Sequence, residues 1–301
     1  MSQTATPAAA VPSPPSRRGG RRRWNPTVGN VRAFLMVLPL LALVVGLVLY
    51  PLVKLTIDSL TQDAGLGNYA DVFASDATRK AMVTTLLASV VVTVITVTVG
   101  ATLAWYLVTA RSTLVKAVLW LAVLAPFWMG TVVKNYAIIL LIANDGVLND
   151  VLSALGLGRA QLLYTTGAVI MGIVYSMVPY AVFSLYGVFV GIDQSLLAAA
   201  RSMGATRARA LRTVLLPLAM PGIVASAALV FAISIGFYVT PVLLGGGQAP
   251  FMASVISSNI FGYYDYGFAS AASVLLLLVA VVVLAAALLA VGRERLMRAV
   301  A

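Results

Sequence analysis

Long uncharged apolar stretches recur along the chain and are separated by short polar segments. A helix needs about 20 predominantly apolar residues to cross the hydrocarbon core of a bilayer. Six stretches reach that length, and none shows the strict alternation that indicates a half-buried strand. We expect spans at about Ala33–Ile57, Ala81–Ala110, Ala117–Ala143, Ala160–Gly191, Leu218–Thr240 and Tyr266–Gly292. The pattern predicts an all-α polytopic membrane protein with six transmembrane helices.

The fifth apolar stretch continues beyond its predicted span but is interrupted there. Pro241, the triplet Gly245–Gly247 and Pro250 break it. The remainder, Phe251–Tyr264, is too short to cross a bilayer, so we expect an interfacial or re-entrant piece on the outer side.

Charge is scarce and unevenly distributed. Hydrophobic residues make up 61% of the chain and charged residues 10%, with a formal net charge of +11. Most basic residues fall in the N-terminal tail, the loop Arg111–Lys116, the segment Asp193–Arg212 and the C-terminal tail, whereas acids predominate in the other loops. Short cytoplasmic loops carry the excess of Lys and Arg, so we expect both termini in the cytoplasm. Topology accounts for the charge, and no nucleic-acid partner is expected.

Several kinds of chemistry are excluded by absent residue types. The chain has no cysteine and no histidine, which excludes disulfides, histidine metal sites and Ser-His or Cys-His catalysis. No G-x-x-x-x-G-K-[ST] motif occurs, so the chain does not bind ATP through a P-loop. We expect no enzymatic activity, no cofactor and no metal.

The segment Asp193–Arg212 is polar and basic between two apolar spans. Asp193 or Ser195 can cap a short helix, and Gly204 can take a positive φ and end it. Thr206 can then cap a second short helix, which Pro217 limits. We expect an elbow, defined as these two helices joined at Gly204, lying along the membrane face. An amphipathic helix resting on lipid headgroups is the simpler interpretation of such a segment.

The order of small residues in and after this segment resembles the EAA loop of binding-protein-dependent ABC importer permeases. Ala199-Ala200, Gly204-Ala205, Leu216-Pro217 and Pro221-Gly222-Ile223 match that pattern, while Ala198 stands where the family has Glu. The family's loop is the coupling helix seated in a groove of the ATPase subunit, and the missing carboxylate removes one charge-assisted contact there. The resemblance assigns the coupling loop to residues 191–217. It gives ATPase coupling to Ala198, Ala199, Ala200, Arg201, Met203, Gly204, Ala205 and Arg207, and the loop exit to Pro217, Pro221 and Gly222.

Further stretches resemble the spermidine/putrescine-type branch of these permeases over residues 30–293. They are Asn68–Phe73, Ala125–Trp128, Lys134–Tyr136, Asp145–Asn149, Leu163–Thr165, Val178–Tyr180, Phe237–Pro241 and Tyr266–Ser270. The resemblance implies an importer that works by alternating access, with two P-loop ATPase subunits, a second permease chain and an extracytoplasmic solute-binding protein as partners. It places the chain in the inner membrane of a bacterium.

Lys134 lies within the predicted third span, where a lysine costs about 2.5–3.5 kcal/mol to insert. It can snorkel to the outer headgroups, join a structural pair or face the translocation path. Neutral groups that can line such a path are Tyr136, Tyr175, Tyr180 and Tyr238, although aromatic residues at helical spacing are more often packing residues. No acid lies in the middle of a span, so a cation site is expected elsewhere.

The alternatives are a secondary transporter and a membrane scaffold subunit. A secondary transporter needs ion-coupling carboxylates or broken helices in paired repeats, and the sequence indicates neither. The expected organisation is a disordered basic tail at residues 1–30, a six-span permease domain at 31–292 and a cytoplasmic tail at 293–301.

Overall fold

The computed structural model describes residues 30–300, and the side chains of 37–287 and 289. The chain divides into two compact units, residues 1–51 and 52–301, and the boundary falls within the first helix. Apart from Asn30, the predicted disordered tail lies outside the described residues.

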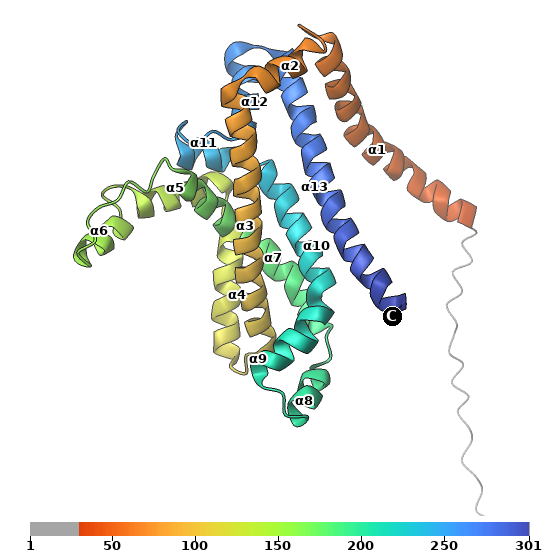
Figure 1. The fold of residues 1–301 in the computed structure, drawn as a ribbon, viewed down its shortest axis with the longest axis vertical. Helices are drawn as coiled ribbons and strands as arrows, with labels where there is room; N and C mark the ends of the chain where they lie inside the picture. Colours follow the sequence, from red (N-terminus) through yellow and green to blue (C-terminus); the bar gives the residue numbers. More distant parts are fainter. Residues whose placement is uncertain (1–29, 301) are drawn as a thin grey trace, which may run out of the picture. The chain divides into compact units, whose positions relative to one another are not determined.

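Every regular element in the described residues is helical (Figure 1). The elements are α1 Asn30–Thr61, α2 Gly67–Ala74, α3 Asp76–Thr109, α4 Thr113–Trp128, α5 Thr131–Ile142, α6 Val147–Ala154, α7 Thr166–Val190, α8 Gln194–Ser202, α9 Arg207–Ala210, the π-helical turn η1 Leu211–Leu215, α10 Leu216–Ile235, α11 Val239–Gly245, α12 Met252–Ser258, the π-helical turn η2 Asn259–Tyr263 and α13 Tyr266–Val300. The all-α prediction is confirmed.

Six helical stretches are long and apolar enough to cross a membrane, as predicted. They are Val37–Thr61, Asp76–Thr109, Thr131–Ala154, Thr166–Val190, Arg207–Ile235 and Tyr266–Ala287. The sixth belongs to α13, which continues as a helix to Val300, so the predicted C-terminal tail extends the last span as far as the structure describes it.

The core of the second unit is formed by α3, α7 and α10, which pack on one another. The buried face of α3 carries small and hydroxyl-bearing residues such as Thr85, Ser89 and Thr96, whereas Leu87 and Val94 are exposed. Small residues inside and large apolar residues outside are typical of helices that pack within lipid. At Gly100 the approach of α7 is so close that a Cβ would lie 2.6 Å from the Cβ of Ala181. These features fit a membrane-embedded bundle.

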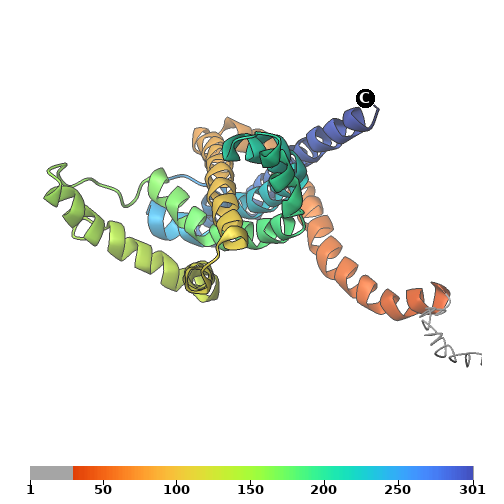
Figure 2. The ribbon, with the colours of Figure 1, turned by 90° about the horizontal axis from the view of Figure 1, so that it is seen from below.

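The third predicted span, Ala117–Ala143, is wrong as a single helix. The structure divides it into α4 and α5 at Met129–Gly130, where the backbone is extended. Pro126 in the last turn of α4 has no N–H to donate, which weakens the helix just before the break. The stretch long and apolar enough to cross is instead Thr131–Ala154, in which α5 and α6 are joined by a turn at residues 143–146. Seen from below, α5 and α6 extend away from the core of α3, α7 and α10 (Figure 2).

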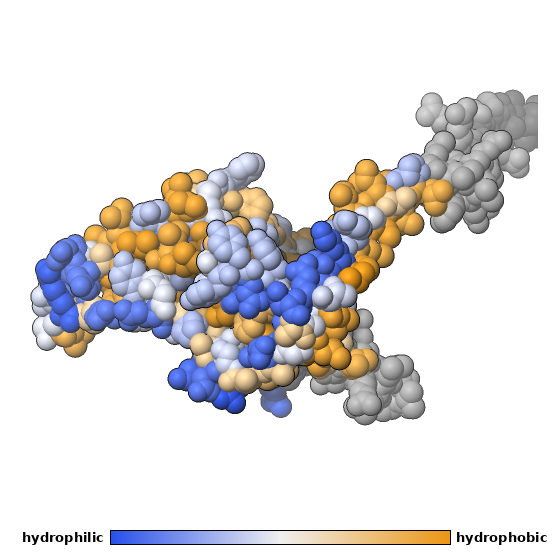
Figure 3. All heavy atoms as spheres, turned by 90° about the horizontal axis from the view of Figure 1, so that it is seen from above, coloured by the Kyte–Doolittle hydropathy of each residue, from blue (hydrophilic) through white to orange (hydrophobic). Residues whose placement is uncertain are grey.

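The piece after the fifth span forms α12 and η2, two elements too short to span. α12 packs on α3 and α13, and its first amide, on Met252, donates a 2.8 Å hydrogen bond to Thr85 Oγ1. α2 and α12 lie at one end of the bundle, and α8 and α9 lie at the other (Figure 1). Viewed onto the end with α2 and α12, polar side chains gather over the face and apolar ones flank it (Figure 3).

Candidate functional site

The first helix of the elbow, α8, begins at a side-chain cap. Asp193 Oδ1 accepts a 2.8 Å hydrogen bond from the backbone N–H of Ser195. That hydrogen bond holds the pKa of the Asp193 carboxyl below its ordinary value. The second helix, α9, begins at Thr206, whose Oγ1 accepts from the backbone N–H of Arg209 at 3.2 Å. Both predicted caps are confirmed.

Gly204 joins the two helices with a φ of +88°, as its sequence context predicts. The backbone N–H of Ala205 donates to the carbonyl of Ala200 at 3.1 Å, and the N–H of Gly204 donates to the carbonyl of Arg201 at 3.0 Å. This pair of bonds is the Schellman arrangement, which satisfies the last carbonyls of a helix and requires a left-handed residue. No atom outside the neighbouring residues lies within 4 Å of the place a Cβ would take at Gly204, so only the backbone angle demands glycine.

The side chains of α8 fall on different faces, because residues three and four apart share a side of a helix. Leu197 and Ala200 are buried against the core of the second unit. Leu196, Ala199 and Met203 form an exposed apolar stripe, in which the Met203 side chain is 83% exposed. The predicted coupling residues therefore divide by role: Ala200 holds the helix in place, whereas Ala199 and Met203 present a surface.

The second elbow helix does not end at Pro217, so that prediction is wrong. α9 continues through η1 into α10, and the whole stretch from Arg207 to Ile235 is helical. Pro217 lacks the N–H that the preceding turn would use, and it follows directly on a π-helical turn in which the amide of Leu216 pairs with the carbonyl of Leu211. Pro221 lies further along, inside α10. Gly222, predicted as part of the loop exit, lies inside α10 against Val188 of α7.

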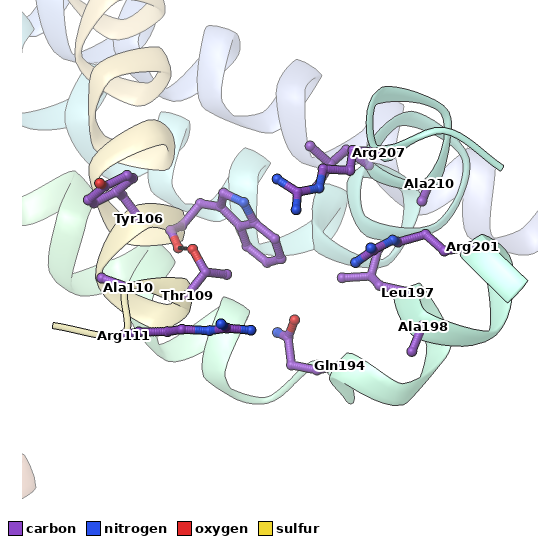
Figure 4. Close-up of a pocket in the computed structure, with 12 residues that line it drawn as sticks. Tyr106, Thr109, Ala110, Arg111, Gln194, Leu197, Ala198, Arg201, Arg207 and Ala210 are labelled. Atoms are coloured by element: carbon purple, nitrogen blue, oxygen red, sulfur yellow. Dashed lines mark hydrogen bonds between the residues drawn. The ribbon is translucent and has the colours of Figure 1, made fainter.

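A pocket of about 660 Å³ lies between the end of α3 and the elbow. Trp105 and Tyr106 line one side of the pocket. Arg111, which follows α3, and Arg201 and Arg207 of the elbow point toward the same space, and Ala198 lies at its rim (Figure 4). Two predicted coupling residues besides Ala198, namely Arg201 and Arg207, thus face this pocket and not the exposed apolar stripe.

Lys134 lies in the first turn of α5, directly after the break in the third span, and is 9% exposed. No ion pair in the described residues involves it. The next residue, Asn135, is fully buried and exchanges hydrogen bonds of 3.1 and 3.2 Å with the hydroxyl of Thr240 in α11. Sequence reasoning missed this Asn135–Thr240 pair, although an amide inside an apolar span was a readable signal.

The predicted path tyrosines contact different helices. Tyr175 lines a small apolar pocket of about 130 Å³ beside α4, and the ring of Tyr180 lies 5.6 Å from that of Phe127 in α4. Tyr238, between α10 and α11, accepts a 2.9 Å hydrogen bond from Ser257 of α12. Tyr136 in α5 is 55% exposed. These contacts do not gather the four tyrosines into one cluster.

Residues 18–295 match the family described as the binding-protein-dependent transport system inner membrane component. The chain belongs to this family. It is therefore a multi-pass inner-membrane protein and a transport component, not an enzyme. The elbow of this family member begins after its fourth candidate span, and its second helix is the start of the fifth, within the range to which the sequence assigns the coupling loop.

Two relatives and one solved structure are similar to this chain. The chain is 29% identical over 188 residues to the spermidine/putrescine transport system permease protein PotB of Escherichia coli (strain K12), which covers 62% of this chain and 68% of PotB. It is 34% identical over 154 residues to PotB of Haemophilus influenzae, covering 50% of this chain and 54% of that protein. The crystal structure of a bacterial alginate ABC transporter in complex with an alginate pentasaccharide-bound periplasmic protein contains a chain that matches with a TM-score of 0.71 at 20% identity, covering 86% of this chain and 93% of that one. This last likeness establishes the fold.

Proposed function

We propose that the chain is the membrane-spanning permease subunit of an ATP-driven importer and transmits ATPase movement through the elbow. The observation that carries this proposal is the elbow itself, held in one shape by two side-chain caps and a Schellman turn in a member of a binding-protein-dependent transport family. A segment that only rested on headgroups would not need its two helices fixed at a defined angle. The fixed shape of the elbow favours binding by a partner protein.

The partner surface is the exposed apolar stripe of α8. Leu196 is 46% exposed and Met203 83% exposed, at an end of the bundle away from α2 and α12. An apolar stripe on a polar segment is unfavourable in water and is stabilised when a protein groove covers it. We assign the groove to a P-loop ATPase subunit, of which an importer with two permease chains carries two.

Disrupting that stripe is expected to separate the chain from its ATPase. Leu196→Asp and Met203→Asp place a carboxylate where the groove is apolar, so co-purification of the ATPase should fall by roughly tenfold or more. Ser202→Asp is the matched control, because it adds the same charge to the same helix outside the stripe. Pull-down of the ATPase from membranes that express both subunits provides the measurement. Equal recovery with Met203→Asp and with Ser202→Asp would exclude the stripe as the contact.

The cargo is a small solute delivered by an extracytoplasmic binding protein, and a polyamine is the class that the PotB relatives favour. Within the described residues, the core of α3, α7 and α10 buries no acid that would hold a polycation. The binding protein is therefore assigned the selectivity, and the permease pair the passage by alternating access. Lys134, Tyr136, Tyr175, Tyr180 and Tyr238 remain the proposed path residues of this half. A second, homologous permease chain provides the other half.

We further propose that the elbow end faces the cytoplasm. The elbow carries Arg201, Arg207, Arg209 and Arg212 without an ion pair in the described residues. At the opposite loops the charge is balanced, since Arg159 pairs with Asp145 at 2.8 Å and with Asp150 at 3.2 Å. Unbalanced positive charge marks the cytoplasmic side.

Cysteine labelling tests this orientation against a background without native cysteines. A membrane-impermeant maleimide should label Leu157→Cys in intact cells, because Leu157 is 73% exposed in the loop with the paired acids. Ser202→Cys, on the elbow, should react only after permeabilisation. Labelling of Ser202→Cys in intact cells would reverse the orientation of every span.

A further inference from the structure

The pocket between α3 and the elbow concentrates positive charge that the described chain does not neutralise. The guanidinium groups of Arg111, Arg201 and Arg207 line it, and no Asp or Glu does. Within the described residues, ion pairs form only at Arg79 and Arg159. Three like charges that converge on one space repel one another unless an anion lies between them.

We propose that this pocket is a binding site for a phosphate-bearing anion. Guanidinium groups bind phosphate oxygens through paired, charge-assisted hydrogen bonds. The three here come from three separate segments, namely the turn after α3, α8 and α9. Gln194 lies between Arg111 and Arg201 and adds an amide donor (Figure 4). A space of about 660 Å³ accommodates a phosphate together with the small polar group that it esterifies.

Ala198 explains why this chain in particular leaves the pocket positive. It lines the pocket one helical turn before Arg201, at the position where the EAA pattern has Glu. A glutamate there would lie at i,i+3 from Arg201, where opposite charges on a helix attract. Alanine removes that internal carboxylate and leaves the space open for an external anion.

The nearest acid in the sequence does not take the role of that carboxylate. Asp193 precedes α8, and its side chain is engaged at the helix cap by the N–H of Ser195. It is not among the residues that line the pocket. The three arginines are thus available to a ligand.

Two sources supply a phosphate at this place. The pocket lies where the long apolar helix α3 ends, with Trp105 and Tyr106 beside it, and aromatic residues at a span's end mark the headgroup level of a bilayer. Basic pockets at that level bind anionic lipid headgroups. A soluble phosphate compound can reach the same arginines, because the pocket is open.

This site is separate from the proposed ATPase contact. Gln194, Ala198 and Arg201 recur on one side of α8, whereas Leu196, Ala199 and Met203 lie on the opposite side. Occupation of the pocket therefore leaves the apolar stripe free. Loss of anion binding and loss of ATPase association can be measured independently.

Binding is tested with the full chain in phosphatidylcholine nanodiscs. In one arm, inorganic phosphate is titrated by equilibrium dialysis. In the other, the nanodiscs contain phosphatidylglycerol, and the lipid that stays bound after release from the disc is measured by native mass spectrometry. Arg201→Gln and Arg207→Gln should each weaken binding about tenfold. Arg209→Gln and Arg212→Gln, on the same elbow but outside the pocket, should change it less than about twofold.

Ala198 provides the second pair of variants, and neither removes an arginine. Ala198→Glu restores an internal carboxylate and should abolish anion binding, whereas Ala198→Gln, of equal size and no charge, should retain it. Saturable phosphate binding would identify a soluble anion, and retained phosphatidylglycerol would identify a headgroup; either supports the site. Absence of binding in both arms, or an equal loss with Arg209→Gln and Arg201→Gln, would overturn it.

Discussion

A valine in place of Gly204 is expected to leave membrane insertion intact and to lower ATP-driven uptake by about tenfold or more. Gly204 has a φ of +88°, a conformation that costs a β-branched residue about 1–3 kcal/mol. Because no atom beyond the neighbouring residues lies near the added Cβ, the whole effect comes from the backbone angle. The Schellman turn opens, and α8 no longer holds its stripe at the angle that the proposed ATPase contact requires. Uptake in proteoliposomes and recovery of the ATPase provide the measurements.

Gly204→Asn is the matched control for this prediction. Asparagine adopts the left-handed conformation far more readily than valine, so it should retain most of the uptake that valine removes. If Gly204→Val transported and bound its ATPase like the unmodified chain, the elbow would be an interfacial helix, and the coupling proposal would lose its main support.

Lys134→Leu is expected to insert at least as well as the unmodified chain and to lower uptake several-fold. Replacing a lysine inside a spanning segment by leucine removes a cost of insertion. Lys134 is nonetheless buried, in the first turn of α5 beside the Asn135–Thr240 hydrogen bond. An ionisable side chain kept inside the membrane at that cost usually serves a path or an interior partner. The amount of protein in the membrane and the rate of uptake must be measured together.

Two further substitutions are controls for the Lys134 experiment. Val133→Leu changes the neighbouring position, which is 60% exposed, and should alter neither insertion nor uptake. Lys134→Arg keeps the positive charge and should preserve most of the uptake. Normal uptake by Lys134→Leu at normal expression would instead assign this lysine to snorkelling toward the headgroups.

The elbow could be read from the sequence because its signals are local. Asp193 and Thr206 cap helices that begin within three residues of them, and Gly204 ends α8 through bonds inside one turn. Such features depend on short-range geometry alone. The same holds for five of the six spans, whose apolar length is visible without knowledge of any neighbour, although their ends shift by several residues.

What the sequence did not provide depends on contacts between distant segments. The pocket forms because Arg111, just after α3, lies close to Arg201 of the elbow. No local sequence pattern indicates that these two residues share a pocket. The break at Gly130 was missed because the apolar run is continuous across it, and hydropathy does not register a change of backbone direction. Pro217 was misjudged because a π-helical turn can accommodate a proline that would otherwise end a helix.

The unbroken helix from Arg207 to Ile235 has a mechanical consequence. At 1.5 Å per residue it is roughly 40 Å long, and Gly222 lies near its middle. Gly222 keeps the helix against Val188 of α7, which makes that crossing a natural pivot. The helix can then tilt as a lever with two arms of nearly equal length, one ending at the elbow and the other beside Tyr238. Under the proposed function, a movement imposed at the elbow reaches the opposite end with about the same size and the reverse direction.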